Sequence, residues 1–549
     1  MARSPCHTIA SGDNCLYDGR VPALLAVGLL LLAATPAPAQ TFTFAWPTEP
    51  VQLDPAVVSD GPSLGLTYQV FEGLVRLRGS TTEIEPALAE RWETSADGMV
   101  WTFHLRPNVR FHDGDPLDAA AVVWNVERWW KSSHPQHAIQ LQAGQTFEYW
   151  DSLFGGPDER AVVSRVEAAG PRAVRITLRR PHAPLLASLA VPGLGIASPR
   201  AATRWGAEFG KHPVGTGAFR FGAWRPGEEV VLEANPDYWG ARPKVARVVG
   251  RAIKDNAKRL AALRAGDIQG MEGLNPDDLE GVRREPTLSL LLRPPSTTGF
   301  VAFNFKVREF QDRRVRRAFA HALDKPAIVN ALYGGMGLVA RQLQPPALWG
   351  HAPDIPDDAR DPATARDLLR QAGFPNGLDT LTWDDGRKEP LVLWYLPVSR
   401  PYFPVPRDIA QAMAADWAKA GIRVRLQTVD WAVYLERVQH GRLPLFMLGW
   451  IADHGDPDGC LCYVFCEPGA PNQGFYANRA VTELLVRART LSSQAQRAPL
   501  YRRAAELLHE DAARLFLAHS QSPIVLSRRV TGYVPNPTGA EAFSTVELR

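Results

Sequence analysis

Asp453 and Arg400 are the residues of this chain whose surroundings point most directly to ligand chemistry. Asp453 follows the apolar run 445–451, which predicts a buried strand that ends in a polar loop. A carboxylate at such a strand end is partly desolvated and favours a cationic partner, although an aspartate in a turn can also simply cap its own backbone. Arg400 stands between Pro397 and Pro401, which stiffen its loop, and its planar guanidinium suits a carboxylate. In one pocket the two side chains would hold the ends of a zwitterion, whereas paired with each other they would form a structural salt bridge.

The loop after Asp453 also carries candidate metal ligands. Asp456 and Asp458, followed by a glycine, resemble the start of a calcium loop, but Phe465 stands near the place of the closing glutamate. A zinc site would need His454 beside nearby cysteines, and their spacing matches no structural zinc pattern. We therefore expect neither a metal nor a cofactor, and the two additional aspartates are interpreted as residues that shape the loop.

Three of the five cysteines, Cys460, Cys462 and Cys466, lie in this one segment, and the other two lie within the first 20 residues. In an oxidising compartment two of them could pair locally and leave one free. The spacing alone does not choose between the possible pairs.

Length and composition indicate an ordinary globular protein with more than one lobe. The chain has 549 residues, 45% of them hydrophobic and 22% charged. The formal net charge is +3, from 61 Lys and Arg against 58 Asp and Glu, so nothing indicates a nucleic-acid interface.

The N-terminal segment has the features of an export signal. The apolar stretch 21–34 is preceded by Arg3 and Arg20 and followed by Ala37-Pro38-Ala39. This order of a basic region, an apolar core and a small-residue site predicts cleavage after Ala39. A retained membrane anchor is the alternative.

Helical and strand patterns alternate along the rest of the chain and predict an α/β protein with mixed sheets. We expect helices over 67–77, 119–130 with Asp118 as the N-cap, and 497–515. Two lobes without a flexible tether suggest several chain crossings and a hinge. The expected organisation is a signal peptide over 1–39, lobe I with an extra subdomain over 40–298, lobe II over 299–523, and a return to lobe I over 524–549.

The sequence holds no readable catalytic motif. A Gly-x-Ser-x-Gly elbow, a His-Glu-x-x-His pair and a phosphate-binding loop are all missing. We therefore expect no enzyme, with a secreted hydrolase as the distant alternative.

Short segments in a fixed order resemble the extracellular solute-binding proteins of peptide and nickel ABC importers, and most of all the bacterial periplasmic dipeptide-binding proteins. The segments cover essentially the whole mature chain: Leu53-Asp54-Pro55-Ala56, Phe71-Glu72-Gly73-Leu74, Val214-Gly215-Thr216-Gly217, Asn235-Pro236-Asp237-Tyr238-Trp239, Ala302-Phe303-Asn304, Pro397 to Tyr402, Ala415 to Lys419, Trp431-x-x-Tyr434-Leu435, and Gly449 to Asp458.

The resemblance implies an α/β, two-lobed periplasmic-binding-protein fold with mixed sheets, a hinge and an interlobe ligand cleft. It assigns the ligand's carboxylate to Arg400 and its α-amino group to Asp453. Tyr402 and Trp450 match residues near the ligand, with core packing as the other interpretation. We further expect the first lobe to add backbone hydrogen bonds around Ser59 and Gly61, as in strand addition.

This chain departs from the family pattern at its cysteines. Members often pair the cysteine at the position of Cys466 with one downstream, but residues 474–479 offer no partner. Local pairing is therefore in doubt.

The function implied is that of a monomeric periplasmic protein, secreted by a cleaved signal peptide. It would bind dipeptides or short peptides and deliver them to the ABC permease subunits in the inner membrane. The alternatives within this class are longer peptides, glutathione, haem or a nickel chelate; a periplasmic chaperone or chemosensory relay on the same fold is a third possibility.

Overall fold

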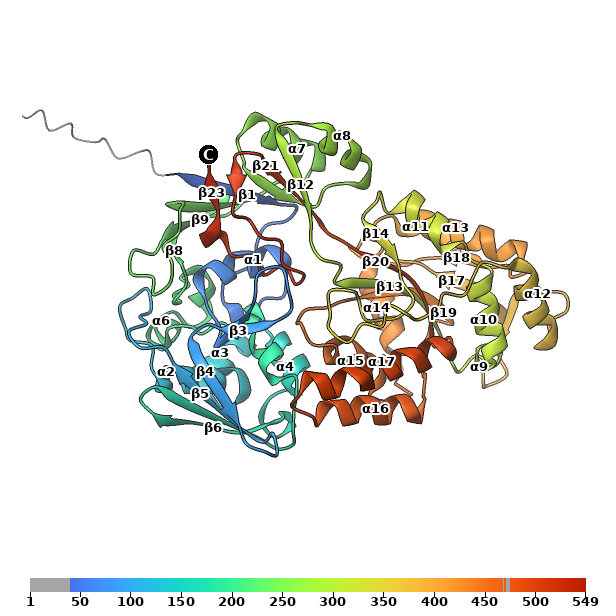
Figure 1. The fold of residues 1–549 in the computed structure, drawn as a ribbon, viewed down its shortest axis with the longest axis horizontal. Helices are drawn as coiled ribbons and strands as arrows, with labels where there is room; N and C mark the ends of the chain where they lie inside the picture. The colour runs from blue at the N-terminus through green and yellow to red at the C-terminus, as the bar shows by residue number, and fades with distance from the viewer. Residues whose placement is uncertain (1–39, 468, 471–473) are drawn as a thin grey trace, which may run out of the picture. The chain divides into compact units, whose positions relative to one another are not determined.

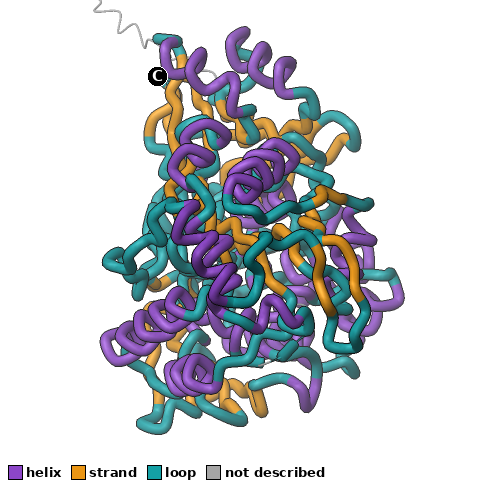
Figure 2. Tube along the Cα trace, turned by 90° about the vertical axis from the view of Figure 1, so that its right-hand side faces the viewer, coloured by secondary structure: helices purple, strands orange, loops and turns teal. Residues whose placement is uncertain are grey.

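The computed structural model describes residues 40–467, 469–470 and 474–549. The expected signal peptide, residues 1–39, therefore lies outside the described residues. Helices and strands are interspersed along the described chain (Figure 1, Figure 2). No helix in this part of the chain is long and apolar enough to cross a membrane.

A seven-stranded mixed sheet begins with the first described strand. β1 (Thr41–Trp46) runs parallel to both of its neighbours, β10 and β11, whereas the next strands outward on each side are antiparallel. The strands lie in the order β12 (Leu288–Leu292), β21 (Pro523–Ser527), β11 (Gly270–Glu272), β1, β10 (Arg247–Ala252), β9 (Glu229–Ala234) and β8 (Phe219–Arg225).

A six-stranded mixed sheet carries the strand that leads to Asp453. Its order is β14 (Gly337–Val339), β20 (Arg514–Ser520), β13 (Thr297–Phe303), β19 (Leu445–Ile451), β17 (Val392–Trp394) and β18 (Arg425–Gln427). β19 pairs antiparallel with β13 on one side and parallel with β17 on the other.

The smaller sheets and the helices complete the architecture. The four-stranded sheet has the order β4 (Ala89–Thr94), β5 (Val100–Leu105), β7 (Ala173–Leu178) and β6 (Val163–Gly170). Short two-stranded pairs are β2 (Val75–Leu77) with β3 (Ile84–Pro86), β15 (Thr380–Thr382) with β16 (Lys388–Pro390), and β22 (Val530–Thr531) with β23 (Glu547–Leu548). The helices are α1 (Gly61–Val70), α2 (Ala119–Trp130), α3 (Pro135–Gln142), α4 (Glu148–Phe154), α5 (Leu185–Leu189), α6 (Pro199–Trp205), α7 (Asn256–Ala265), α8 (Leu279–Arg284), α9 (Arg308–Gln311), α10 (Arg313–His321), α11 (Lys325–Leu332), α12 (Pro362–Gln371), α13 (Pro406–Lys419), α14 (Trp431–Gln439), α15 (Asp458–Phe465), α16 (Arg479–Arg489) and α17 (Gln494–Glu510).

The first part of β19, Leu445 to Met447, is covered on both faces, which explains why its apolar residues do not alternate with polar ones. Leu445 and Met447 pack into the core shared with α10, α11 and α13. Phe446 points to the opposite face, into the core that α14 to α17 build. Because successive side chains of a strand alternate between faces, both sets of positions must be apolar here. The strand is consequently a stiff support for the loop that follows.

The chain passes between the two large sheets twice. β12 belongs to the seven-stranded sheet and β13 to the six-stranded one, while β20 and β21 make the reverse passage. Arg293, at the first crossing, binds Glu541 from the C-terminal segment at 2.6 Å and Glu272 at 2.9 Å. The α/β class with mixed sheets is confirmed, whereas the lobe boundaries at 298 and 523 stay a prediction.

Local signals predicted some elements correctly and others wrongly. The helix at 119–130 is confirmed, and the Asp118 side chain accepts a hydrogen bond from the Ala121 N–H. The helix expected over 67–77 is wrong: α1 starts earlier, at Gly61, because Asp60 caps it and Pro62 lies in its first turn, and it ends at Val70. Residues 75–77 pair with β3 instead.

The helix expected over 497–515 is wrong at its C-terminal end. α17 stops at Glu510, and Ala512 adopts a left-handed conformation with φ of 46°. From Arg514 onward the chain is β20, which is buried on both faces between β13 and β14. Burial in the sheet therefore overrides the helical pattern in this segment.

Candidate functional site

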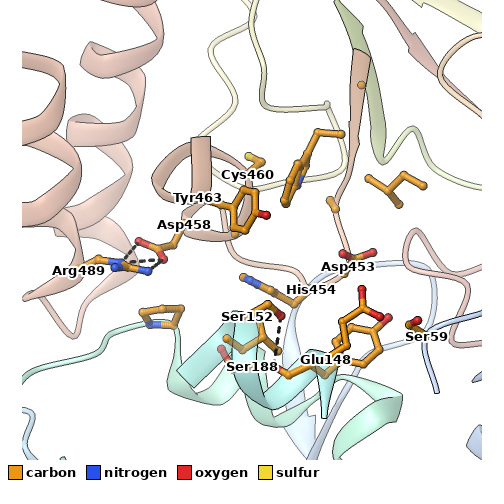
Figure 3. A pocket seen from close by; sticks show the side chains of 18 of the residues that line it. Ser59, Glu148, Ser152, Ser188, Asp453, His454, Asp458, Cys460, Tyr463 and Arg489 are labelled. Atoms are coloured by element: carbon orange, nitrogen blue, oxygen red, sulfur yellow. Dashed lines mark hydrogen bonds and ion pairs between the residues drawn. The ribbon is translucent and has the colours of Figure 1, made fainter. Parts of the chain in front are cut away.

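A cavity of about 440 Å³ opens at the end of β19 (Figure 3). Its walls come from segments far apart in the sequence: Ser59, the helix α4, the loop before α5, Tyr402, the stretch from Gly449 to Tyr463, and Arg489. Four of the six predicted ligand-binding residues line it: Asp453, Trp450, Tyr402 and Ser59. Gly61, the first residue of α1, lines an adjoining cavity of about 200 Å³ together with Ser59 and Asp453.

The backbone beside Asp453 is fixed by the sheet. Thr297 pairs with Ile451 at the end of the ladder between β13 and β19. One residue further, the Ala452 N–H donates to the Ser296 carbonyl at 2.8 Å. Asp453 is thus the first residue that leaves the sheet, and its backbone position is set by its neighbour.

The Asp453 carboxylate faces the cavity without a partner. No hydrogen bond or ion pair of this side chain is found among the described residues. Solvent in the cavity reaches the carboxylate, yet protein surrounds it on most sides. This desolvation, reinforced by the negative charge of Glu148, raises the pKa of Asp453 to about 7. A cation that enters the cavity would stabilise the ionised form.

The other two aspartates of the loop are held by arginines. Asp456 accepts hydrogen bonds from both terminal nitrogens of Arg497, at 2.6 and 2.7 Å, in an ion pair that is almost fully buried. Asp458 pairs with Arg489 at 3.0 Å (Figure 3). These pairs anchor the loop to α16 and α17, so neither carboxylate is available to a ligand in the way Asp453 is.

Tyr402 packs over a pair of glycines. Gly449 lies directly opposite Gly299 in the ladder between β19 and β13. A Cβ on Gly449 would lie 2.2 Å from the Tyr402 ring, and a Cβ on Gly299 would lie 2.5 Å from the Tyr402 carbonyl oxygen. That carbonyl also accepts a hydrogen bond from the Tyr333 hydroxyl at 3.0 Å. The ring is therefore held as a fixed wall of the cavity, and its burial raises the pKa of Tyr402 to about 12.

Trp450 forms an aromatic wall with Tyr463 of α15. Their ring centroids are 4.6 Å apart. Both residues, with Gly449, also border a second cavity of about 170 Å³, whose lining is mainly apolar. Trp450 therefore contributes both to the site and to core packing, so the two interpretations of this residue do not exclude each other.

Arg400 is the predicted site residue that lines neither this cavity nor the adjoining one. Its guanidinium carbon lies 4.5 Å from the centroid of the Trp431 ring, and its buried Nε has no hydrogen-bond partner among the described residues. A tight turn with backbone hydrogen bonds to Phe403 orients the side chain this way. Arg400 and Asp453 form no ion pair, so the structural salt bridge considered as an alternative is excluded.

The structure shows which of the three cysteines are paired, a question that the sequence left open. Cys462 and Cys466 form a disulfide within one turn of the helix. Cys460 is free and buried, borders the cavity, and donates its Sγ–H to the Pro457 carbonyl at 3.2 Å. Burial raises the pKa of its thiol, so Cys460 stays protonated.

Glu148, Tyr149 and His182 are lining residues that sequence reasoning missed. Each belongs to a segment without a recognisable motif, and each reaches the cavity only through tertiary packing. No signal in the sequence alone could have connected them with Asp453.

Comparisons with known proteins agree on one family. Residues 83–472 match the model described as bacterial extracellular solute-binding proteins, family 5 Middle. The dipeptide-binding protein of Escherichia coli is 31% identical over 544 residues, covering 96% of this chain and 98% of the relative. The heme-binding protein A of Haemophilus influenzae is 33% identical over 523 residues, covering 92% of each chain.

A solved structure shares the fold. It is the ABC transporter-associated periplasmic binding protein DppA from Helicobacter pylori in complex with the peptide STSA. It aligns with a TM-score of 0.74 at 30% identity and covers 92% of this chain and 98% of its own. These matches confirm the resemblance seen in the sequence and the two-lobed binding-protein fold: this chain belongs to the bacterial extracellular solute-binding proteins of family 5.

Proposed function

We propose that this chain is the periplasmic substrate-binding component of an ABC importer and that its ligand is a dipeptide or short peptide. The observation that carries the proposal is the unpartnered Asp453 carboxylate, which a doubly covered strand presents to a cavity. A peptide's N-terminal ammonium is a compact cation that such a carboxylate binds well. The peptide-binding relatives within the family support this choice of ligand.

The cavity also has the character of a small-molecule site. It combines aromatic walls from Tyr402 and Trp450 with a few charged groups, the usual composition of a selective pocket. Ser59 and Gly61 border the region beside Asp453 from the first part of the chain. In this proposal their backbone groups bind the peptide's main chain in the manner of strand addition.

Arg400 keeps its proposed role as the anchor of the peptide's carboxylate. Its guanidinium lies on the face of Trp431, and a ligand carboxylate would have to draw it away from that ring. The unpartnered Nε supports this proposal, because a bound carboxylate would satisfy the buried donor.

Location and partners complete the proposal. Export by a signal peptide would place the mature chain, from Gln40 onward, in the periplasm as a monomer. There it would deliver its ligand to the permease subunits in the inner membrane. Ligand binding would favour a closed arrangement of the two lobes by its differential affinity for that state.

Calorimetry of the mature chain with a panel of dipeptides tests the proposal. Asp453→Ala and Arg400→Ala should each weaken binding strongly. The matched controls are Asp267→Ala and Arg423→Ala, which remove exposed charges outside the cavity. Normal binding by both Asp453→Ala and Arg400→Ala would overturn the proposed site, and no binding of any dipeptide by the unmodified chain would overturn the proposed ligand.

Haem is the second candidate ligand, because one relative of comparable identity is a heme-binding protein. His182 and His454 are the histidines that border the cavity, and both are buried with a lowered pKa, which leaves a neutral ring of the kind that ligates iron. An absorbance titration with haem separates the candidates: a saturable spectral shift that dipeptides do not compete away would favour haem.

A further inference from the structure

The charges that line the cavity are unbalanced. The lining contains three carboxylates and one guanidinium: Glu148, Asp453, Asp458 and Arg489. Asp458 and Arg489 pair with each other at 3.0 Å, so their charges largely cancel. Glu148 and Asp453 are left as two carboxyl groups without a countercharge, and both face one cavity (Figure 3).

The remaining titratable groups of the lining do not offset this charge. His182 and His454 have pKa values lowered by burial and are neutral near pH 7. Burial also raises the pKa values of the Tyr149 and Tyr402 phenols and of the Cys460 thiol, which stay protonated. The lining therefore has a net negative charge that no described residue of the cavity wall balances.

Glu148 acts directly on Asp453. It is the first residue of α4, is exposed to the cavity, and forms no ion pair or side-chain hydrogen bond among the described residues. Its charge is the electrostatic contribution that raises the pKa of Asp453 beyond the effect of burial. The negative charge of Glu148 disfavours the ionisation of Asp453 in this partly desolvated site, and a cationic ligand removes this penalty.

A further polar group of the cavity lining, His182, lacks a partner in the described part of the chain. His182 exposes only 6% of its surface, and its Nε2 has no hydrogen-bond partner among the described residues. As a neutral imidazole it can form one further hydrogen bond at this nitrogen, as acceptor or as donor according to its tautomer. Tyr149 and Trp450 add aromatic faces that attract a cation.

The geometry points to Glu148 as a second cation anchor, so that the cavity selects ligands with two positive charges near one end. For a peptide ligand, which rests on the proposed function, this means a basic first residue such as lysine, arginine or ornithine. Asp453 binds the N-terminal ammonium and Glu148 binds the cationic side chain. Asp453 thus recognises any peptide amine, whereas Glu148 sets the preference among peptides.

The peptide test compares Lys-Ala with norleucyl-Ala, whose side chain has the same carbon chain but lacks the terminal ammonium. The unmodified chain should bind Lys-Ala at least about tenfold more tightly, as expected for one charge-assisted contact. Glu148→Gln should reduce this preference to less than about twofold while Ala-Ala still binds, since the amide keeps the shape and loses the charge. Glu90→Gln, an exposed glutamate of β4 outside the cavity, is the matched control and should keep the preference.

A second pair of probes makes the result independent of peptide binding. The diamine cadaverine should bind more tightly than the monoamine pentylamine, and Glu148→Gln should abolish the difference. If this holds while no peptide binds, the two-cation site stands and the proposed peptide function falls. If peptides bind but Lys-Ala and norleucyl-Ala bind equally, or if Glu148→Gln keeps the preference, the second anchor is refuted.

Discussion

The pH dependence of ligand binding follows from the raised pKa of Asp453. In the ligand-free protein this carboxyl has a pKa of about 7, because of desolvation and then the charge of Glu148. An ammonium binds the ionised carboxylate and lowers its pKa in the complex. Ligand binding therefore releases a proton below pH 7, and the affinity falls as the pH decreases through the pKa of the free protein.

The expected size of the effect follows from the fraction of ionised protein. A group with a pKa of 7 is ionised in about one molecule in a hundred at pH 5, so the affinity for Ala-Ala should fall by up to about 100-fold between pH 8 and pH 5. Solvent in the cavity screens the carboxylate, which makes this value an upper limit. The α-amino group of the ligand itself titrates near pH 8, so the affinity should fall again as the pH rises above about 8.

Calorimetry in two buffers of different ionisation enthalpy measures both the affinity and the proton release. Asp453→Asn should bind weakly and lose the pH dependence between pH 5 and 7. Glu148→Gln should shift the fall in affinity to lower pH, because it removes the neighbouring negative charge. An affinity for Ala-Ala that stays constant, or rises, from pH 8 to pH 5 would refute the assignment of Asp453 as the amine anchor.

Two further predictions concern the supports of the site. Gly449→Ala would place a methyl group 2.2 Å from the Tyr402 ring and should lower the free energy of unfolding, measured by urea denaturation, by about 1–3 kcal/mol. Gly281→Ala in α8, where the added methyl group would meet open space, should not destabilise the protein. Equal stability of the two variants would contradict the packing of Tyr402 over Gly449. Arg497→Met would leave the buried Asp456 carboxylate without its partner and should lower the free energy of unfolding by about 3–5 kcal/mol. Adding Asp456→Asn should restore part of this stability. A double variant as unstable as Arg497→Met alone would show that the unpaired charge is not the cause.

The strand before Asp453 was predictable because its run of apolar residues reflects its burial between two cores. Where a strand is covered on both faces, every position must be apolar, and Leu445, Phe446 and Met447 meet this condition. The start of α2 was likewise predictable from Asp118 alone, because its side chain caps the helix locally. Where local residue patterns determine an element, the sequence was sufficient to predict it.

The failures share a different cause. Residues 511–515 carry a helical pattern, but the sheet between β13 and β14 requires a strand there, so tertiary pairing decides the outcome. The direction of Arg400 depends on Trp431, and the charge beside Asp453 depends on Glu148, a residue of a distant segment. Such contacts leave no periodic pattern, which is why the net negative charge of the cavity emerged only from the fold.

A crystal structure of the mature chain with bound Ala-Ala tests the central assignment most directly. The peptide nitrogen should lie about 2.7–3.0 Å from an Asp453 carboxylate oxygen, inside the cavity at the end of β19. A peptide bound with its carboxylate toward Asp453, or bound outside this cavity, would contradict the assignment.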